Sequence, residues 1–129
     1  MSYPQLLTAE EKLFQAKQAL DIPPIIVICG STRFMADMQE ANLRETAAGH
    51  VVLAPGVNMK EPHGLWATEE QAEPLKARLD ALHRAKIRLA DEVLVIGDST
   101  RAEIRYAASL GMPIRYTHPE VDPLLAKEA

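Results

Sequence analysis

The run of sequence that decides the fold is Ile25-Ile26-Val27-Ile28-Cys29, and Gly30-Ser31-Thr32 follows it directly. Successive side chains of a strand point to opposite faces of a sheet, and every side chain in this run is apolar. A strand built from it is therefore expected to be covered on both faces, which is typical of a central strand in a parallel sheet.

Three more strands and several helices are predicted from the surrounding sequence. The further strands cover residues 51–53, 92–96 and 113–116. Apolar residues at helical spacing predict the helices, which cover residues 8–20, about 33–48, a third that ends near residue 89, and 100–110. The start of the third helix is open, because Thr68 and Gln71 suit a capping box whereas Pro74 suits the first turn of a helix that begins later.

The alternation of strands and helices predicts a parallel sheet with right-handed crossovers. For four strands we expect the order 2-1-3-4, a small doubly wound α/β sheet of the Rossmann or flavodoxin-like kind. Helices are expected on both faces, with an extra helix at the N-terminus. Residues 1–129 are expected to form a single domain, in which residues 1–22 are the N-terminal helix and linker.

Composition excludes several classes of function. Of the 129 residues, 47% are hydrophobic and 25% are charged, which is typical of a globular domain. The net charge of −4 argues against a nucleic-acid polymer as partner. The single cysteine, Cys29, excludes an internal disulfide and a cysteine-based zinc cage. The longest apolar run is too short for a membrane span and no signal peptide is visible, so we expect a cytoplasmic protein.

Two loops of small and hydroxyl residues are predicted to meet at the switch point, between the carboxyl ends of the first and third strands. In the first loop, Gly30 allows close backbone approach, Ser31 and Thr32 offer hydroxyls and amides, and Arg33 adds a planar charged donor. That set suits a phosphate or carboxylate. The alternative is an ordinary turn into a helix, with Ser31 or Thr32 as its N-cap.

The second loop supplies Asp98, Ser99 and Thr100, and Glu103 follows in the first turn of the next helix. Glu103 is either a functional carboxylate or the partner of Thr100 in a capping box. Asp98 is either a ligand contact or a turn residue.

Other polar residues are weaker candidates. His83 is expected to be a partly buried histidine that a neighbouring group satisfies. Asp80 and Asp91 are candidate second carboxylates, although Asp91 is expected to cap a helix end or turn. In the long connection at 54–67, His63 and Trp66 either close over a base or ring, or Trp66 fills the edge of the core.

Cys29 itself is expected to be a small buried hydrophobe. No cluster of histidines and carboxylates in the sequence has the spacing of metal ligands, so we predict no metal.

Three motifs in order along the chain resemble one family. They are Cys-Gly-Ser-Thr-Arg at 29–33, Ala-Asp-Glu-Val-Leu-Val-Ile at 90–96, and Ser-Thr-x-x-Glu-Ile-x-Tyr-Ala at 99–107 with Gly-Met-Pro at 111–113. The chain resembles the nucleoside 2-deoxyribosyltransferase-like superfamily, which includes deoxynucleoside 5′-monophosphate N-glycosidases. The resemblance covers about residues 25–116.

The resemblance implies cleavage of the N-glycosidic bond of a nucleoside or nucleotide, by hydrolysis or base transfer, without a cofactor. Glu103 matches the family glutamate that attacks or stabilises the anomeric carbon. Ser31, Arg33 and Ser99 match residues near the 5′-phosphate. Family members commonly form dimers or larger assemblies, so the resemblance also implies a homo-oligomer.

The chain departs from the family pattern at three places. The connection from Ile96 to Thr100 is short, which leaves little loop to cover a ligand. His83 stands where many members carry an aspartate, and it can donate a proton to the leaving base. Val27 and Ile28 stand where many members carry a tyrosine. These departures favour the alternative hypothesis, a nucleotide-binding module without turnover.

Overall fold

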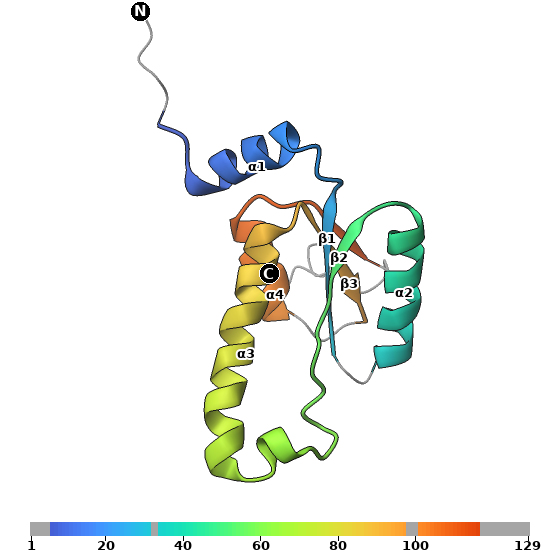
Figure 1. The fold of residues 1–129 in the computed structure, drawn as a ribbon, viewed down its shortest axis with the longest axis vertical. Coiled ribbons are helices and arrows are strands. Elements are labelled where there is room, and N and C mark those ends of the chain that lie inside the picture. The colour runs from blue at the N-terminus through green and yellow to red at the C-terminus, as the bar shows by residue number, and fades with distance from the viewer. Residues whose placement is uncertain (1–5, 32–33, 98–100, 117–129) are drawn as a thin grey trace, which may run out of the picture.

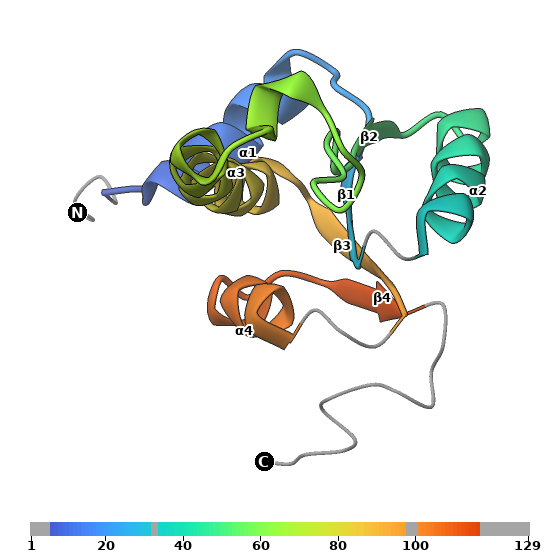
Figure 2. The same cartoon turned by 90° about the horizontal axis from the view of Figure 1, so that it is seen from below.

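The computed structural model describes residues 6–31, 34–97 and 101–116. A four-stranded sheet carries helices on both faces (Figures 1 and 2). The elements are α1 (Ala9–Ala19), β1 (Ile25–Gly30), α2 (Met35–Ala47), β2 (Val51–Leu53), η2 (Gly64–Trp66), α3 (Glu69–Leu89), β3 (Glu92–Ile96), α4 (Arg101–Ser109) and β4 (Ile114–Tyr116).

The sheet has the strand order β2-β1-β3-β4, and each neighbouring pair is parallel. Ile25 lies opposite Val51 across β1 and β2, and Gly30 lies opposite Ile96 across β1 and β3. The predicted order 2-1-3-4, the helices on both faces and the N-terminal helix are all confirmed. The switch point therefore lies between β1 and β3, where their carboxyl ends meet.

Alternate residues of β1 enter two separate cores, as the apolar run predicts. Val27 and Cys29 face α3 and α4 and pack with Ile87 and Ile104. Ile26 and Ile28 face α2, where Met38 and Ala41 cover them. Figure 2 shows α2 on one side of the sheet and α3 and α4 on the other. The residues from Ile26 to Cys29 are 0% exposed, so β1 is the buried centre of the molecule.

The third helix begins before Pro74. The Thr68 side chain accepts a hydrogen bond from the Gln71 amide, and the Gln71 side chain accepts one from the Thr68 amide. A start at Pro74 is wrong, because this capping box begins α3 at Glu69. Pro74 lacks the amide that would bond the Glu70 carbonyl, but both residues are exposed, so water can satisfy that carbonyl.

One buried lysine anchors α1 to the sheet. Lys17 is 7% exposed, and its Nζ lies 2.7 Å from Asp91 Oδ1 and 3.0 Å from the Leu89 carbonyl oxygen. Asp91 Oδ2 accepts a hydrogen bond from the Ile25 amide at 2.8 Å. Asp91 thus joins α1 and β1 at the amino end of the sheet, away from the switch point.

None of the described helices combines the length and the apolar character that crossing a membrane requires.

Candidate functional site at the switch point

Two glycines allow β1 and β3 to end close together. A Cβ at Gly30 would lie 2.8 Å from the Ile96 carbonyl oxygen. Gly97 has a φ of +80°, and a Cβ there would overlap the ring of Phe34. Packing between strands and loops therefore explains both glycines, and it also brings the ends of the two predicted loops together.

Two cavities that share lining residues open beside these strand ends, and we describe them as two lobes of one pocket. Its first lobe, of about 160 Å³, lies between α3, α4 and the loop that follows β2. Its second lobe, of about 230 Å³, lies between α3 and α4. Three side chains line both lobes: Asp80, His83 and Glu103. We call these two lobes the switch-point pocket.

Glu103 occupies the position that the sequence indicates, in the first turn of α4. Its side chain is half-buried and lines the pocket with Gly30 of β1. Its negative charge acts on two neighbouring groups. It helps to raise the pKa of Cys29, and it opposes the lowering of the pKa of His83. A carboxylate thus faces the cavity at the carboxyl end of the sheet.

His83 is half-buried and contacts a neighbouring side chain, as predicted. Its Nε2 lies 3.4 Å from Sγ of Cys29. Burial lowers the pKa of His83 and Lys86 adds to this effect, whereas Glu103 and Asp80 act in the opposite direction. The imidazole is therefore more often neutral at neutral pH than an exposed histidine would be.

Asp80 and Lys86 are among the other residues of α3 that line the pocket. Asp80 lies beside His83 and Glu103 and supplies a second carboxylate, whereas Asp91 is held by Lys17. Lys86 lines the first lobe, and its Nζ donates a hydrogen bond to the Ala54 carbonyl at 2.9 Å. Sequence reasoning missed Lys86, although its place one helical turn after His83 is the signal that could have indicated it.

The first residues of the long connection after β2 line the switch-point pocket, whereas its aromatic residues do not. Pro55, Gly56 and Val57 line the first lobe. His63 and Trp66 stack on each other with ring centroids 4.8 Å apart, and Trp66 Nε1 donates to the Glu61 carbonyl. These two residues line neither lobe, and Trp66 belongs to neither core cluster.

Most of the predicted anion-binding residues lie outside the described residues: Thr32, Arg33, Asp98, Ser99 and Thr100. Gly30 and Ser31 of the first loop are described, and Ser31 is the hydroxyl residue among them. It is half-buried, and its carbonyl accepts a hydrogen bond from the Phe34 amide at 2.9 Å.

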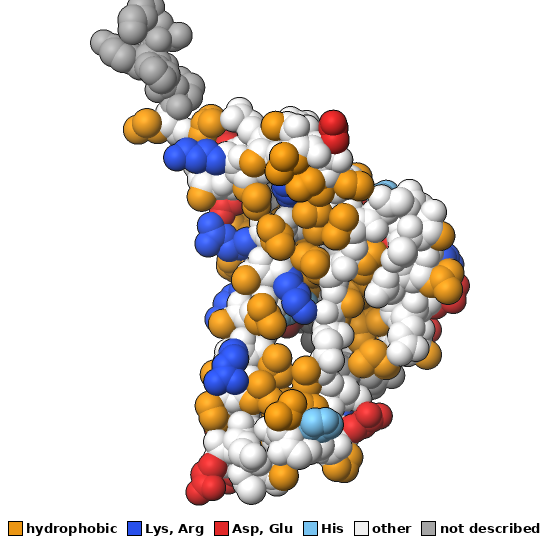
Figure 3. All heavy atoms as spheres, in the orientation of Figure 1, with side chains coloured by type: hydrophobic (Ala, Val, Ile, Leu, Met, Phe, Trp, Pro, Cys, Tyr) orange, Lys and Arg blue, Asp and Glu red, His pale blue; other side chains and the backbone are white. Residues whose placement is uncertain are grey.

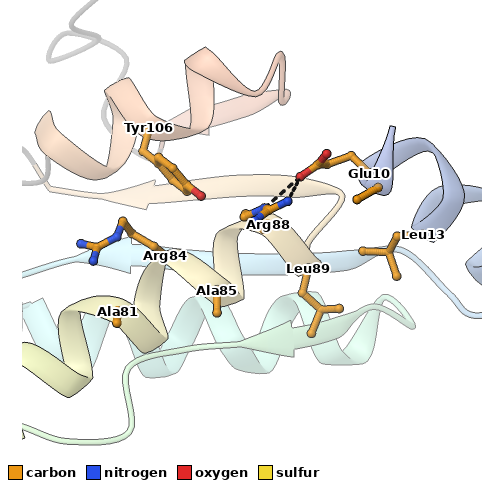
Figure 4. Close-up of a pocket in the computed structure, with 9 residues that line it drawn as sticks. Glu10, Leu13, Ala81, Arg84, Ala85, Arg88, Leu89 and Tyr106 are labelled. Carbon is orange, nitrogen blue, oxygen red and sulfur yellow. Dashed lines mark hydrogen bonds and ion pairs between the residues drawn. The ribbon is translucent and has the colours of Figure 1, made fainter. Parts of the chain in front are cut away.

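A second cavity, of about 440 Å³, lies between α1, α3 and α4. In Figure 4, Arg88 and Glu10 pair across it, and Tyr106 extends from α4 toward α3. Leu13 and Leu89 form part of its apolar lining. Across the part of the chain that the structure describes, no three His, Cys, Asp or Glu side chains gather to hold a metal ion.

Comparison with known proteins found no matching family model, no matching curated protein and no matching solved structure. The fold itself defines the class. This is a small α/β protein with a Rossmann-like parallel sheet of four strands, and its switch-point pocket carries two carboxylates and a histidine.

Proposed function

We propose that this protein cleaves the N-glycosidic bond of a nucleoside or of its 5′-monophosphate. The observation that carries the proposal is the meeting of Glu103, Asp80 and His83 in one pocket at the switch point. These residues come from two helices, and open α/β sheets bind ligands at this end. The resemblance to the nucleoside 2-deoxyribosyltransferase-like superfamily, in which a glutamate matches Glu103, supports the same reaction.

The charges in the pocket suit this chemistry. As the bond between C1′ and the base breaks, its electron pair leaves with the base and positive charge develops on the sugar. The Glu103 carboxylate stabilises or traps that charge. In a hydrolase, water then attacks C1′ and loses a proton to the imidazole or to the departed base, and any bond between C1′ and Glu103 breaks. In a transferase, a second base attacks C1′ instead.

The leaving base needs a proton or a hydrogen bond, and His83 supplies one. Because the pKa of His83 is lowered, the neutral ring donates a hydrogen bond at neutral pH, and full proton transfer becomes more frequent as the pH falls. Asp80 then holds the sugar or the base through its carboxylate.

The sugar and phosphate are assigned to the two loops. Gly30, Ser31, Thr32 and Arg33 follow β1, and Asp98, Ser99 and Thr100 follow β3. A phosphate held by Arg33 would favour hydrolysis of a 5′-monophosphate. The reaction needs no metal and no cofactor.

A second copy of the chain is the proposed partner, and it is expected to cover α3. Ile87 is the buried residue of this helix, whereas Glu73 and Arg84 are exposed and, about three helical turns apart, lie on the same face. Figure 3 shows hydrophobic side chains over α1 and α3, with Lys and Arg side chains along α3.

Charge differs along α3, with Glu69, Glu70 and Glu73 at its start and Arg84 near its end, where Arg88 already pairs with Glu10 of α1. An antiparallel pair of α3 helices therefore places acidic residues against basic ones, which favours self-association.

The proposed activity is tested by incubating the protein with a panel of nucleosides and 5′-monophosphates and measuring free base by chromatography. We expect release that is lost in Glu103→Gln and kept in Glu40→Gln, an exposed glutamate of α2. Thermal stabilisation by a nucleotide without any base release would instead support the alternative, a binding module without turnover.

A further inference from the structure

The contact between Cys29 and His83 joins the buried sheet to the switch-point pocket. Cys29 ends the apolar part of β1 and is 0% exposed, whereas His83 lies on α3 and lines both lobes of the pocket. Sγ and Nε2 are 3.4 Å apart, which is within hydrogen-bond distance for sulfur. Within the described part of the chain, neither side chain has another hydrogen-bond partner.

Both groups are neutral in the folded protein near neutral pH. Burial, with a smaller contribution from Glu103, raises the pKa of the Cys29 thiol to about 12, so the sulfur keeps its proton. Burial and Lys86 lower the pKa of His83 against the opposing effects of Glu103 and Asp80. A neutral imidazole carries one ring proton, and the hydrogen bond at one nitrogen decides which nitrogen holds it.

The direction of this hydrogen bond follows from what each group can accept. A thiol sulfur is a weak acceptor, whereas an unprotonated imidazole nitrogen is a good one. If Nε2–H donated to Sγ, the thiol proton would remain inside the core without an acceptor among the described groups. The arrangement that satisfies both groups has S–H donating to Nε2, with the ring proton on Nδ1.

We propose that Cys29 is a positioning residue that holds His83 in the tautomer with its proton on Nδ1. The ring nitrogen that remains for a ligand is then a donor. Such a donor matches an acceptor nitrogen or oxygen on the edge of a base, and it repels a donor amino group at the same place. The consequence for catalysis rests on the proposed function, whereas the tautomer itself does not.

Nitrogen NMR of the ¹⁵N-labelled full chain tests the tautomer directly. Protonated and unprotonated ring nitrogens differ widely in chemical shift, and the spectrum is recorded at about pH 8, above the ordinary pKa of histidine. The chain has 4 histidines, so His83 is assigned by the signal that is missing in His83→Gln. We expect a protonated Nδ1 and an unprotonated Nε2 in the wild-type protein.

A matched pair of variants isolates the thiol proton. Cys29→Ser keeps a donor of similar size at this position, whereas Cys29→Ala removes the donor. We expect Cys29→Ser to keep the wild-type pattern and Cys29→Ala to shift His83 toward the tautomer protonated at Nε2. A wild-type ring protonated at Nε2, or identical nitrogen shifts in Cys29→Ala, would overturn the proposal, and the wild-type spectrum decides even if a variant fails to fold.

Activity provides a second readout that separates this proposal from the proposed function. If base release is found, we expect Cys29→Ala to lower it by about tenfold and Cys29→Ser to lower it less. If no substrate is cleaved but the tautomer depends on Cys29, the positioning role stands and the proposed function fails. If base is released but both variants match the wild type in tautomer and rate, the positioning role fails alone.

Discussion

Single residues set the geometry of the switch-point pocket, and Gly97 shows this at the end of β3. Its φ of +80° strains any residue with a side chain, and the ring of Phe34 occupies the place where a Cβ would lie. Phe34 directly follows the first predicted ligand loop, so this contact ties the two loops together.

We predict that Gly97→Ala lowers the free energy of unfolding by about 2–3 kcal/mol, because backbone strain and steric overlap add. Chemical denaturation measures the change. Gly64→Ala is the control, since Gly64 has no positive φ and no atom within 4 Å of the added Cβ. Equal stability of the two variants would refute the packing role of Gly97.

The protonation of His83 gives stability a pH dependence of known sign. Burial lowers the pKa of His83 in the folded state below the ordinary value of 6.5. At pH values between the folded and the unfolded pKa, the unfolded chain therefore binds more protons than the folded protein. The contribution of neutral His83 is complete above pH 6.5 and is lost as the pH falls toward the folded pKa.

We therefore predict that the wild-type protein loses more stability than His83→Gln when the pH is lowered from 6.5. Urea denaturation of both proteins at a series of pH values measures this difference. Parallel pH profiles would mean that His83 titrates as freely in the folded protein as in the unfolded chain.

At the scale of elements, a partly buried ion pair anchors α1 to the sheet. Lys17 connects it to Asp91 and to the end of α3, and the remaining partner of Asp91 is the Ile25 amide. Truncation of Lys17 leaves Asp91 half satisfied, and removing one partner of a partly buried pair is costly.

Lys17→Met is predicted to lower stability by about 1–3 kcal/mol and to speed hydrogen exchange across α1. Exchange in β1 and β3 is expected to change much less. Lys12→Met, at an exposed position of the same helix, is the control. If amide exchange in α1 were unchanged by Lys17→Met, the ion pair would not be its anchor.

Local patterns predicted the elements well because their causes are local. The apolar residues from Ile25 to Cys29 must be covered on both faces, and that alone placed β1 at the centre. The start of α3 remained open because Pro74 and the capping box at Thr68 favour different first turns, and only the structure decides between them.

The pocket could be predicted only in part, because long-range packing builds it. Glu103 was placed at the switch point by its position after β3, and the structure puts its side chain in the cavity. Asp80 and Lys86 lie one helical turn on either side of His83, and the packing of α3 beside α4 and the loop after β2 brings them to the pocket. The partner of His83 is Cys29, 54 residues earlier in the chain, which sequence reasoning treated as core.

At the scale of the whole molecule, the exposed face of α3 that carries Glu73 and Arg84 is the proposed surface for a second copy of the chain. We predict a dimer with twice the chain mass of 14.2 kDa, measured by analytical ultracentrifugation. Glu73→Arg places like charges near Arg84 of the second copy in the antiparallel pair and is expected to favour the monomer.

The double variant Glu73→Arg with Arg84→Glu reverses both charges, so we expect the dimer to return. Glu40→Arg on α2 controls for the change in net charge. A wild-type monomer at high protein concentration, or a double variant that stays monomeric, would contradict the antiparallel pairing of α3.

The most direct test of N-glycosidic cleavage at the switch-point pocket is the ratio of kcat/KM for base release between the wild type and Glu103→Gln on the best substrate of the panel. We predict a loss of roughly a thousandfold, about 4 kcal/mol of transition-state stabilisation, while Glu40→Gln stays within about twofold of the wild type. Base release that continues at the wild-type rate in Glu103→Gln would contradict it.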